Sequence, residues 1–197
     1  VGCELAKAYD VASVCIKPYA VKQAVDWLSG SSVMVGTVIG FPQGNSTIAI
    51  KVAETEQACK DGAVEIDMVV NIGKVLGEDW DYVRKEIGAV AEMTHQHGAA
   101  LKVIFENAFL PKDYHKIRLC EICSDLKVDY VKTSTGFGYV KDGGGNIHSI
   151  GALDADLMLM RKHSAAEVKI KASGGIRNLE DALRVRELGA DRIGASG

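Results

Sequence analysis

The chain has 197 residues, 47% of them hydrophobic, and a formal net charge of −3. This length allows one domain with a sizeable core, so we expect residues 1–197 to form a single domain. The mixed charges exclude a basic surface for nucleic acid, and no apolar run reaches the roughly 18 residues that a membrane span needs.

Short apolar segments rich in β-branched residues recur along the chain and predict buried strands. Most are apolar nearly throughout rather than alternating, which is typical of parallel strands that are buried on both faces. In chain order, the segments are residues 12–16, 33–39, 64–70, 99–105, 128–132, 168–172 and 191–195.

Helical patterns separate these segments. Residues 46–61 show apolar side chains at helical spacing, and residues 178–188 begin with Asn178, a favourable N-cap residue. Strands that alternate with helices predict βαβ units and a parallel sheet. Residues 1–9 read as the end of a helix, and residues 191–195 read as a last strand. Seven strands are one fewer than a (β/α)8 barrel contains, so we expect an α/β fold of the TIM-barrel type that lacks its first strand and last helix in this chain.

Among the charged side chains in segments that the pattern predicts to be dry, four are placed toward the carboxyl ends of the strands. They are Asp67, Lys102, Lys132 and Lys171. An unpaired buried charge costs several kcal/mol, although a single one could reach solvent at the mouth of a barrel. Four on neighbouring strands favour a shared site, because barrel enzymes place their chemistry at the carboxyl ends of the strands.

Clustered lysines predict a particular chemistry. A lysine with its ordinary pKa of about 10.4 is almost entirely protonated at pH 7 and is a poor nucleophile. A second ammonium group about 5 Å away disfavours protonation by roughly 3 kcal/mol at an effective dielectric near 20, which lowers the pKa by about two units. Such a lysine can form a Schiff base, and Asp67 could shuttle protons beside it.

Glycines follow the last two predicted strands. Lys171 leads into residues 172–177 (Ala-Ser-Gly-Gly-Ile-Arg), and residues 194–197 (Gly-Ala-Ser-Gly) end the chain. Paired glycines before a helix allow backbone N–H groups to approach an anion, and these two loops are the usual phosphate site of a (β/α)8 barrel. The alternative is that the glycines only make tight turns.

Five segments together resemble the deoxyribose-phosphate aldolase family, in the family's order and over nearly the whole chain. The two most specific are residues 131–136 (Val-Lys-Thr-Ser-Thr-Gly) and 171–177 (Lys-Ala-Ser-Gly-Gly-Ile-Arg). The others are residues 65–71, 37–44 and 13–18. The resemblance implies reversible cleavage of 2-deoxy-D-ribose 5-phosphate to D-glyceraldehyde 3-phosphate and acetaldehyde. It implies no cofactor and no metal, and a homodimer or homotetramer is a further expectation.

The resemblance also implies a role for individual residues. Lys132 would form the imine, Lys171 would depress its pKa, and Asp67 would relay protons with Lys171 and water. Cys15 and Lys102 would line the pocket, Lys102 at its rim or wall. Phosphate contacts would come from Gly136, Gly174, Gly175, Gly194, Ala195 and Ser196.

Two alternatives remain open on the sequence. One is a related Schiff-base aldolase that acts on another phosphorylated sugar, and the other is a non-catalytic barrel that binds phosphosugars. The glycine-rich loop at Gly143–Gly145 could be a mobile cover or a slack connector. Five cysteines without regular spacing argue against a disulfide framework and favour the cytoplasm, and Cys120 and Cys123 are expected to be ordinary helix residues.

Overall fold

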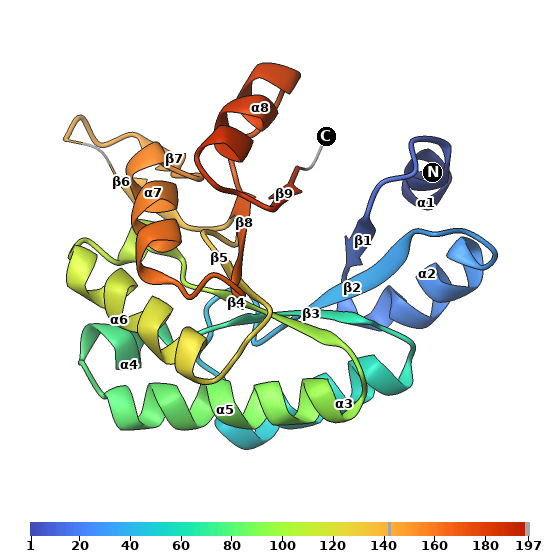
Figure 1. The fold of residues 1–197 in the computed structure, drawn as a ribbon, viewed down its shortest axis with the longest axis horizontal. Helices are drawn as coiled ribbons and strands as arrows, with labels where there is room; N and C mark the ends of the chain where they lie inside the picture. Colours follow the sequence, from blue (N-terminus) through green and yellow to red (C-terminus); the bar gives the residue numbers. More distant parts are fainter. Residues whose placement is uncertain (142, 196–197) are drawn as a thin grey trace.

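Seven parallel strands form one curled sheet at the centre of the molecule (Figure 1). The computed structural model describes residues 1–141 and 143–195. Six of the seven apolar segments contain one strand of this sheet each, and the segment at residues 168–172 covers all but the last residue of the strand Lys169–Ser173, so the predicted positions of the strands are confirmed. In sheet order, the strands are β1 (Ser13–Ile16), β2 (Met34–Ile39), β3 (Glu65–Val69), β4 (Ala100–Ile104), β5 (Tyr130–Lys132), β8 (Lys169–Ser173) and β9 (Arg192–Gly194).

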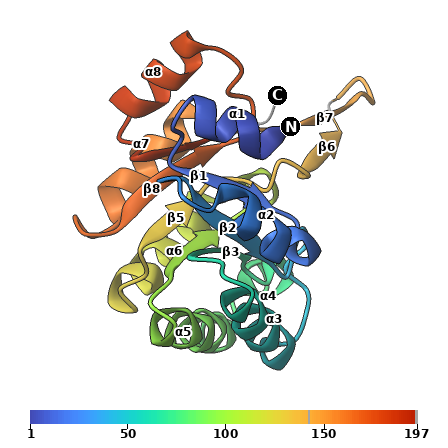
Figure 2. The ribbon, with the colours of Figure 1, turned by 90° about the vertical axis from the view of Figure 1, so that its right-hand side faces the viewer.

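Helices cover the outside of the curl and alternate with the strands along the chain (Figures 1 and 2). The two helices expected at residues 46–61 and 178–188 are present as α3 and α8, and Asn178 caps α8 by accepting a hydrogen bond from the Asp181 backbone N–H at 2.8 Å. The α-helices are α1 (Gly2–Ala8), α2 (Val21–Leu28), α3 (Ile48–Lys60), α4 (Ile72–Leu76), α5 (Trp80–Gln96), α6 (Asp113–Asp125), α7 (Asp154–His163) and α8 (Leu179–Glu187), and short 3-10 turns span Pro18–Ala20 and Asn107–Phe109.

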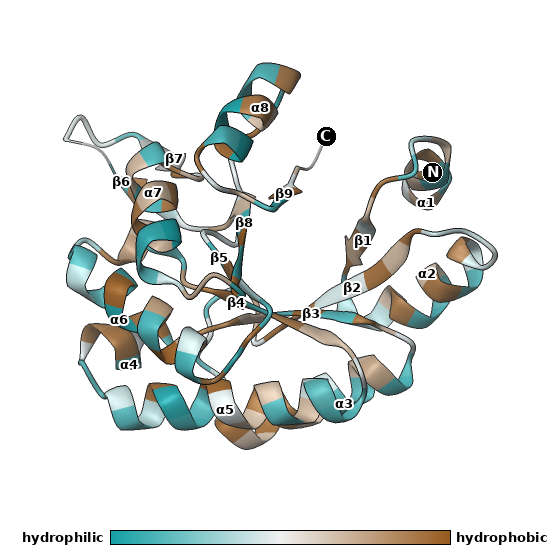
Figure 3. Cartoon of the chain, in the orientation of Figure 1, coloured by the Kyte–Doolittle hydropathy of each residue, from teal (hydrophilic) through white to brown (hydrophobic). Residues whose placement is uncertain are grey.

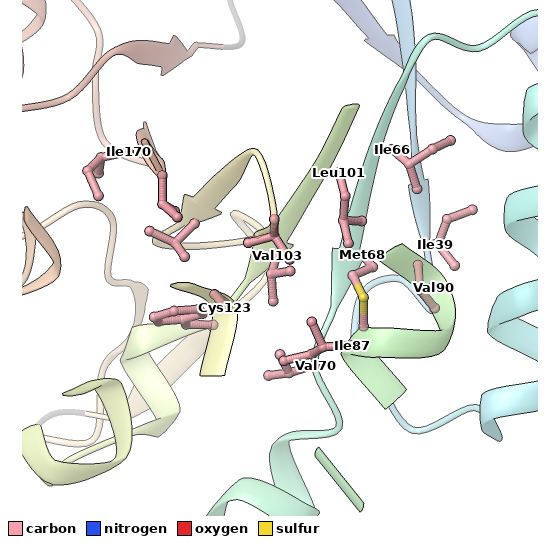
Figure 4. Packing of buried hydrophobic residues seen from close by; sticks show 14 of the residues in the cluster. Ile39, Ile66, Met68, Val70, Ile87, Val90, Leu101, Val103, Cys123 and Ile170 are labelled. Atoms are coloured by element: carbon pink, nitrogen blue, oxygen red, sulfur yellow. The ribbon is translucent and has the colours of Figure 1, made fainter. Parts of the chain in front are cut away.

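The hydrophobic core lies between the outer face of the sheet and these helices. Helices α5 and α6 mix hydrophobic and hydrophilic residues along their length, as expected for helices with one face on a sheet (Figure 3). Met68 and Val103 on the sheet and Ile87 on α5 are all fully buried, and Figure 4 shows them within one cluster. Each such side chain contributes about 1.5–3 kcal/mol through burial, so this outer face holds the strands in position.

The inner face of the sheet is polar, in contrast to the outer face. Parallel pairing sets Asp67 beside Lys102 and sets Lys132 beside Lys171. Paired residues of neighbouring strands point to the same face of a sheet, as do residues two apart on one strand. Glu65 therefore shares the inner face with Asp67, and Arg192, which pairs with Lys171, shares it too.

A two-stranded antiparallel hairpin follows β5, and the sequence analysis missed it. Its strands are β6 (Tyr139–Lys141) and β7 (Ile147–Ser149), and it projects from the body of the molecule (Figure 2). The glycines Gly143–Gly145 lie in the connection between the two strands and are exposed. Within the described residues, no helix is long and apolar enough to cross a membrane.

Candidate active site

Three lysines surround one buried carboxylate inside the curl of the sheet. Asp67 Oδ2 accepts hydrogen bonds from Lys132 Nζ at 2.8 Å and from Lys171 Nζ at 2.7 Å. Lys102 Nζ lies 3.0 Å from the other oxygen, Oδ1. Because two ammonium nitrogens contact the same oxygen, they lie no more than about 5.5 Å apart, the combined length of the two contacts. The predicted cluster of Asp67, Lys132 and Lys171 is therefore present in the structure.

A further acid and base extend this cluster along the inner face. Glu65 Oε2 lies 2.8 Å from Lys102 Nζ, and Glu65 Oε1 lies 3.1 Å from Arg192 Nη1. Arg192 also donates a hydrogen bond to Ser13 Oγ at 3.0 Å, which connects the two edge strands of the sheet. Lys102 is fully buried between two carboxylates, so it belongs to the wall of the site and not to its rim.

Burial and neighbouring charges shift the pKa values of Lys132, Lys171 and Asp67 in different directions. Burial is the main influence that lowers the pKa of Lys132; Asp67 opposes it and Lys171 adds to it. Burial alone would lower the pKa of Lys171, yet Asp67 and Cys15 raise it above its ordinary value. Burial alone would raise the pKa of Asp67, yet the three lysines hold it well below its usual range. Lys132 is thus the amine most easily freed of its proton, while Lys171 stays an ammonium.

This result corrects the physical cause expected from the sequence. The neighbouring ammonium was expected to be the main source of the low pKa of Lys132. In the structure, removal of Lys132 from water has the larger effect, and the charge of Lys171 acts in the same direction. Desolvation disfavours the charged form of any lysine, so the strands that bury Lys132 themselves contribute to its low pKa.

A glycine-lined cavity of about 260 Å³ lies beside the lysines. Five of the six predicted phosphate contacts line it: Gly136, Gly174, Gly175, Gly194 and Ala195. Ile176 and Arg177 also contribute to the wall, and Ser196 lies outside the described residues. Gly174 and Gly175 have φ values of 87° and 78°, a conformation in which successive backbone N–H groups can face an anion.

The cavity adjoins the lysine cluster directly. A Cβ atom at Gly194 would lie 3.3 Å from Lys171 Cε. The loop that follows β5 is joined to the end of β8, because Ser173 Oγ donates a hydrogen bond to the Ser134 carbonyl oxygen at 2.6 Å. An anion in the cavity would therefore place the rest of its molecule next to Lys171 and Lys132.

Cys15 lies on the inner face, in register with Gly36 of the next strand. Its side chain reaches solvent, yet the surrounding protein raises the pKa of its thiol, and Asp67 adds to this effect against the three lysines. Cys120 and Cys123 are buried residues of α6, as the sequence indicated. Burial raises the pKa of both thiols, to about 11 for Cys120, so neither is an activated nucleophile.

Sequence reasoning missed Glu106, which lies two residues after the end of β4. Its side chain is buried, and its Oε2 accepts hydrogen bonds from the backbone N–H and the hydroxyl of Thr135. The signal was present in the sequence, because Glu106 ends an apolar strand segment in the same way as Asp67 and Lys132. Glu65 and Arg192 were missed for a different reason, since their contacts depend on the register of the strands.

The fold and the site together define a lysine-centred enzyme on a TIM-like α/β sheet. The model of the DeoC/LacD family of aldolases matches residues 1–197, and the chain belongs to this family. A deoxyribose-phosphate aldolase of Rhodopirellula baltica is 55% identical over 195 residues, which are 99% of this chain and 76% of the relative.

Solved structures support the same assignment. An aldolase called QR15 is 35% identical, with a TM-score of 0.87 over 98% of this chain and 80% of its own. The deoxyribose phosphate aldolase of Aeropyrum pernix, described as a tetramer, is 27% identical, with a TM-score of 0.84 over 98% of this chain and 76% of its own.

Proposed function

We propose that this protein is a class I deoxyribose-phosphate aldolase that uses Lys132 as its Schiff-base nucleophile. The substrate would be 2-deoxy-D-ribose 5-phosphate, and the products D-glyceraldehyde 3-phosphate and acetaldehyde. The observation that carries the proposal is the placement of Lys132 and Lys171 on one oxygen of Asp67, with only one of the two lysines lowered in pKa. The similarity to aldolases of this name supports the choice of substrate.

In this proposal, the free amine of Lys132 attacks the aldehyde carbon of the open-chain sugar and expels water to form an imine. The protonated imine accepts the electron pair of the C2–C3 bond as that bond breaks, and the C3 hydroxyl loses its proton. The three-carbon product leaves as an aldehyde, and the remaining enamine takes a proton on C2. Water then hydrolyses the imine and releases acetaldehyde.

Proton transfer in this scheme falls to Lys171 and Asp67. Since the pKa of Lys171 is raised, its ammonium group is the natural proton donor to the enamine. Asp67 stays a carboxylate, and it would hold both lysines in place and pass protons between them with water. The Asp67 carboxylate would be held in place by Lys102, which is held in turn by the ion pairs of Glu65 with Lys102 and Arg192.

Phosphate binding would come from the glycine cavity, which adjoins Lys171. The backbone N–H groups near Gly174 and Gly175, together with the start of α8, would hold the anion. Cys15 would line the pocket on the opposite strand. A phosphate at this position would fix the far end of the sugar and leave its aldehyde end free to reach Lys132.

Reductive trapping tests the proposal directly. Acetaldehyde with borohydride is expected to add an ethyl group irreversibly at Lys132, detected by peptide mass spectrometry. Absence of an adduct in the full-length protein would reject the Schiff-base mechanism. A panel of phosphorylated sugars then separates the two catalytic possibilities: turnover of another substrate, but not of deoxyribose phosphate, would indicate a related aldolase. Phosphosugar binding without any turnover would indicate a non-catalytic barrel.

We further propose that the intact protein is one (β/α)8 domain. β1 and β9 are the edges of the sheet, and an eighth strand between them would close it; the chain spans 76% of its Rhodopirellula relative. A strand hydrogen-bonded to both edges is the expected finding in a structure of the intact protein. The tetramer of the Aeropyrum relative supports a homo-oligomer, and five free thiols support work in the reducing cytoplasm.

A further inference from the structure

Glu106 contacts the loop that connects Lys132 of the lysine cluster to Gly136 of the phosphate cavity. It follows β4, where the chain continues beside the extension of β5: the Phe105 backbone N–H donates to the Lys132 carbonyl at 2.9 Å, and that of Asn107 donates to the Thr133 carbonyl at 3.0 Å. Between these two bonds Glu106 has φ 57°, in the left-handed region, which is unfavourable for a residue with a side chain. Strain of this kind is concentrated at functional sites.

The Glu106 carboxylate is enclosed by the loop that follows the nucleophile. Its side chain is almost completely buried, and Oε2 accepts the backbone N–H of Thr135 at 3.2 Å as well as the Thr135 hydroxyl. A Cβ atom at Gly138 would lie 2.8 Å from Oε1, so glycine at that position makes room for the acid. Burial raises the pKa of Glu106, against the effects of Thr135 and Lys132.

Thr135 transmits this contact to the phosphate cavity. Its hydroxyl donates to Glu106 and in turn accepts a hydrogen bond from the Phe137 backbone N–H at 2.9 Å. Gly136 lies between these two anchored residues, has φ 88° and lines the cavity. The ring of Phe137 packs edge-on against Phe41, with the two ring centres 5.5 Å apart. The residues on both sides of Gly136 are therefore joined through the Thr135 hydroxyl, and Thr135 is itself held by two hydrogen bonds to Glu106.

We infer that Glu106 is a positioning residue for the phosphate end of the substrate: through Thr135, it holds the loop between Lys132 and the phosphate cavity in its binding conformation. This inference rests on the proposed aldolase function and adds a residue to it. Its main effect is expected on binding, because both of its hydrogen bonds go to Thr135 and neither goes to a lysine.

The test compares phosphorylated and phosphate-free ligands in the full-length enzyme. Glu106→Ala is expected to raise the KM for deoxyribose 5-phosphate about tenfold or more and to leave kcat within about threefold. Reductive trapping of acetaldehyde at Lys132, which needs no phosphate contact, is expected to stay within about twofold of the wild-type rate. Glu106→Gln keeps an oxygen that can accept both bonds from Thr135, so its KM is expected to remain within about threefold of wild type.

Two further variants separate positioning from general damage. Thr135→Val removes the hydroxyl and leaves Glu106 unchanged, and it is expected to raise the KM as Glu106→Ala does. Thr135→Ser keeps the hydroxyl and is expected to preserve the wild-type KM. Glu78→Ala is a matched control, because Glu78 also has a left-handed backbone, with φ 56°, but its carboxylate is half exposed and contacts Lys112 and His115. Its KM is expected to be unchanged.

Each other outcome counts against the inference. An unchanged KM in Glu106→Ala and in Thr135→Val would overturn it, as would equal losses of phosphosugar binding and of acetaldehyde trapping in either variant. If Glu106→Ala does not fold, Thr135→Val alone decides. A wild-type enzyme that fails to cleave deoxyribose phosphate would refute the proposed function instead, so the two failures are distinguishable.

Discussion

Two buried lysine–carboxylate groups lie on opposite faces of the same sheet, and they are built differently. On the outer face, Lys51 of α3 and Glu86 of α5 form one ion pair, 2.7 Å long, in which both side chains are fully buried. Lys51 Nζ also donates to the Val69 carbonyl at 2.7 Å, and Glu86 accepts the Asn71 backbone N–H at 2.9 Å. One cation meets one anion, and the backbone at the end of β3 completes the arrangement.

The inner group has an excess of positive charge. Among the described residues of this network, Lys102, Lys132, Lys171 and Arg192 share only two carboxylates, Asp67 and Glu65. Burial has the largest effect on the pKa of both Lys51 and Lys132, and it lowers the pKa of each. Lys51, however, has a carboxylate of its own, whereas Lys132 shares Asp67 with two other ammonium groups. The balanced pair joins two helices to the sheet, whereas the unbalanced cluster contains the lysine that we propose as the nucleophile.

The largest expected effect comes from a substitution in the inner group that removes the proposed nucleophile. Lys132→Met is expected to lower aldol cleavage by about four orders of magnitude, because the nucleophile is lost. Lys132→Arg should be equally inactive, since it restores the positive charge without a nucleophilic amine. The measurement is the steady-state rate with deoxyribose 5-phosphate. Appreciable activity in either variant would assign the imine to another lysine.

A substitution in the outer pair is expected to lower the stability of the protein and not its activity. Lys51→Met leaves Glu86 buried without its cation, so we expect the free energy of unfolding to fall by about 3–5 kcal/mol, with kcat of the folded enzyme unchanged. Urea denaturation measures the loss. The control is Lys60→Met, which removes an exposed i,i+4 pair with Glu56 and should have no measurable effect. A loss of kcat without a loss of stability would contradict the structural role of this pair.

The substitution Lys171→Met in the inner group is expected to change how imine formation depends on pH. Lys171 lowers the pKa of Lys132, so its removal should raise that pKa and reduce the free amine at pH 7. Imine formation increases as pH rises through the pKa of Lys132, and the variant should therefore show the same rise at higher pH. Trapping of acetaldehyde is expected to be about tenfold slower at pH 7 or slower still, and to recover in alkali. Lys169→Met, an exposed position on the same strand, is the control, and an unshifted pH profile in Lys171→Met would refute the assignment.

The smallest expected effect concerns the stability of the inner group. Lys132→Met should change the free energy of unfolding by less than about 1 kcal/mol, because Asp67 keeps Lys171 and Lys102 as partners. The same substitution type at Lys51 removes the only cation that contacts Glu86 among the described residues. Denaturation of the two variants side by side measures the difference. Equal losses would mean that the inner charges are as balanced as the outer ones.

Much of this arrangement could be predicted from sequence, because buried parallel strands leave a strong pattern. The seven apolar segments located all the strands of the main sheet, and charged residues within them located Asp67, Lys132 and Lys171. The hairpin of β6 and β7 left no such pattern, since Tyr139 and Lys141 are exposed and no core fixes their period. Its glycines are equally compatible with a turn and with a loop.

The remaining parts of the site depend on contacts between residues that are far apart in the sequence, which a local sequence pattern does not show. The sequence left Lys102 either at the rim or in the wall of the pocket, and the pairing of β3 with β4 places it in the wall, beside Asp67 and two positions from the level of Glu65. Glu106 bonds to Thr135 across 29 residues of sequence and from a left-handed backbone conformation, and a local sequence pattern shows neither. Burial of Lys132, the main cause of its low pKa, is likewise a property of the assembled sheet.

The side-by-side pairing of Lys132 with Lys171, and of Asp67 with Lys102, has a consequence for how this enzyme can be altered. The reacting groups are spaced by backbone hydrogen bonds between strands, so an insertion of one residue within β5 would turn the nucleophile toward the helices. Loops beyond the strand ends carry no such constraint. Directed evolution toward new acceptor aldehydes should therefore find its productive mutations in the loops after β2, β5 and β8, with the strands left untouched.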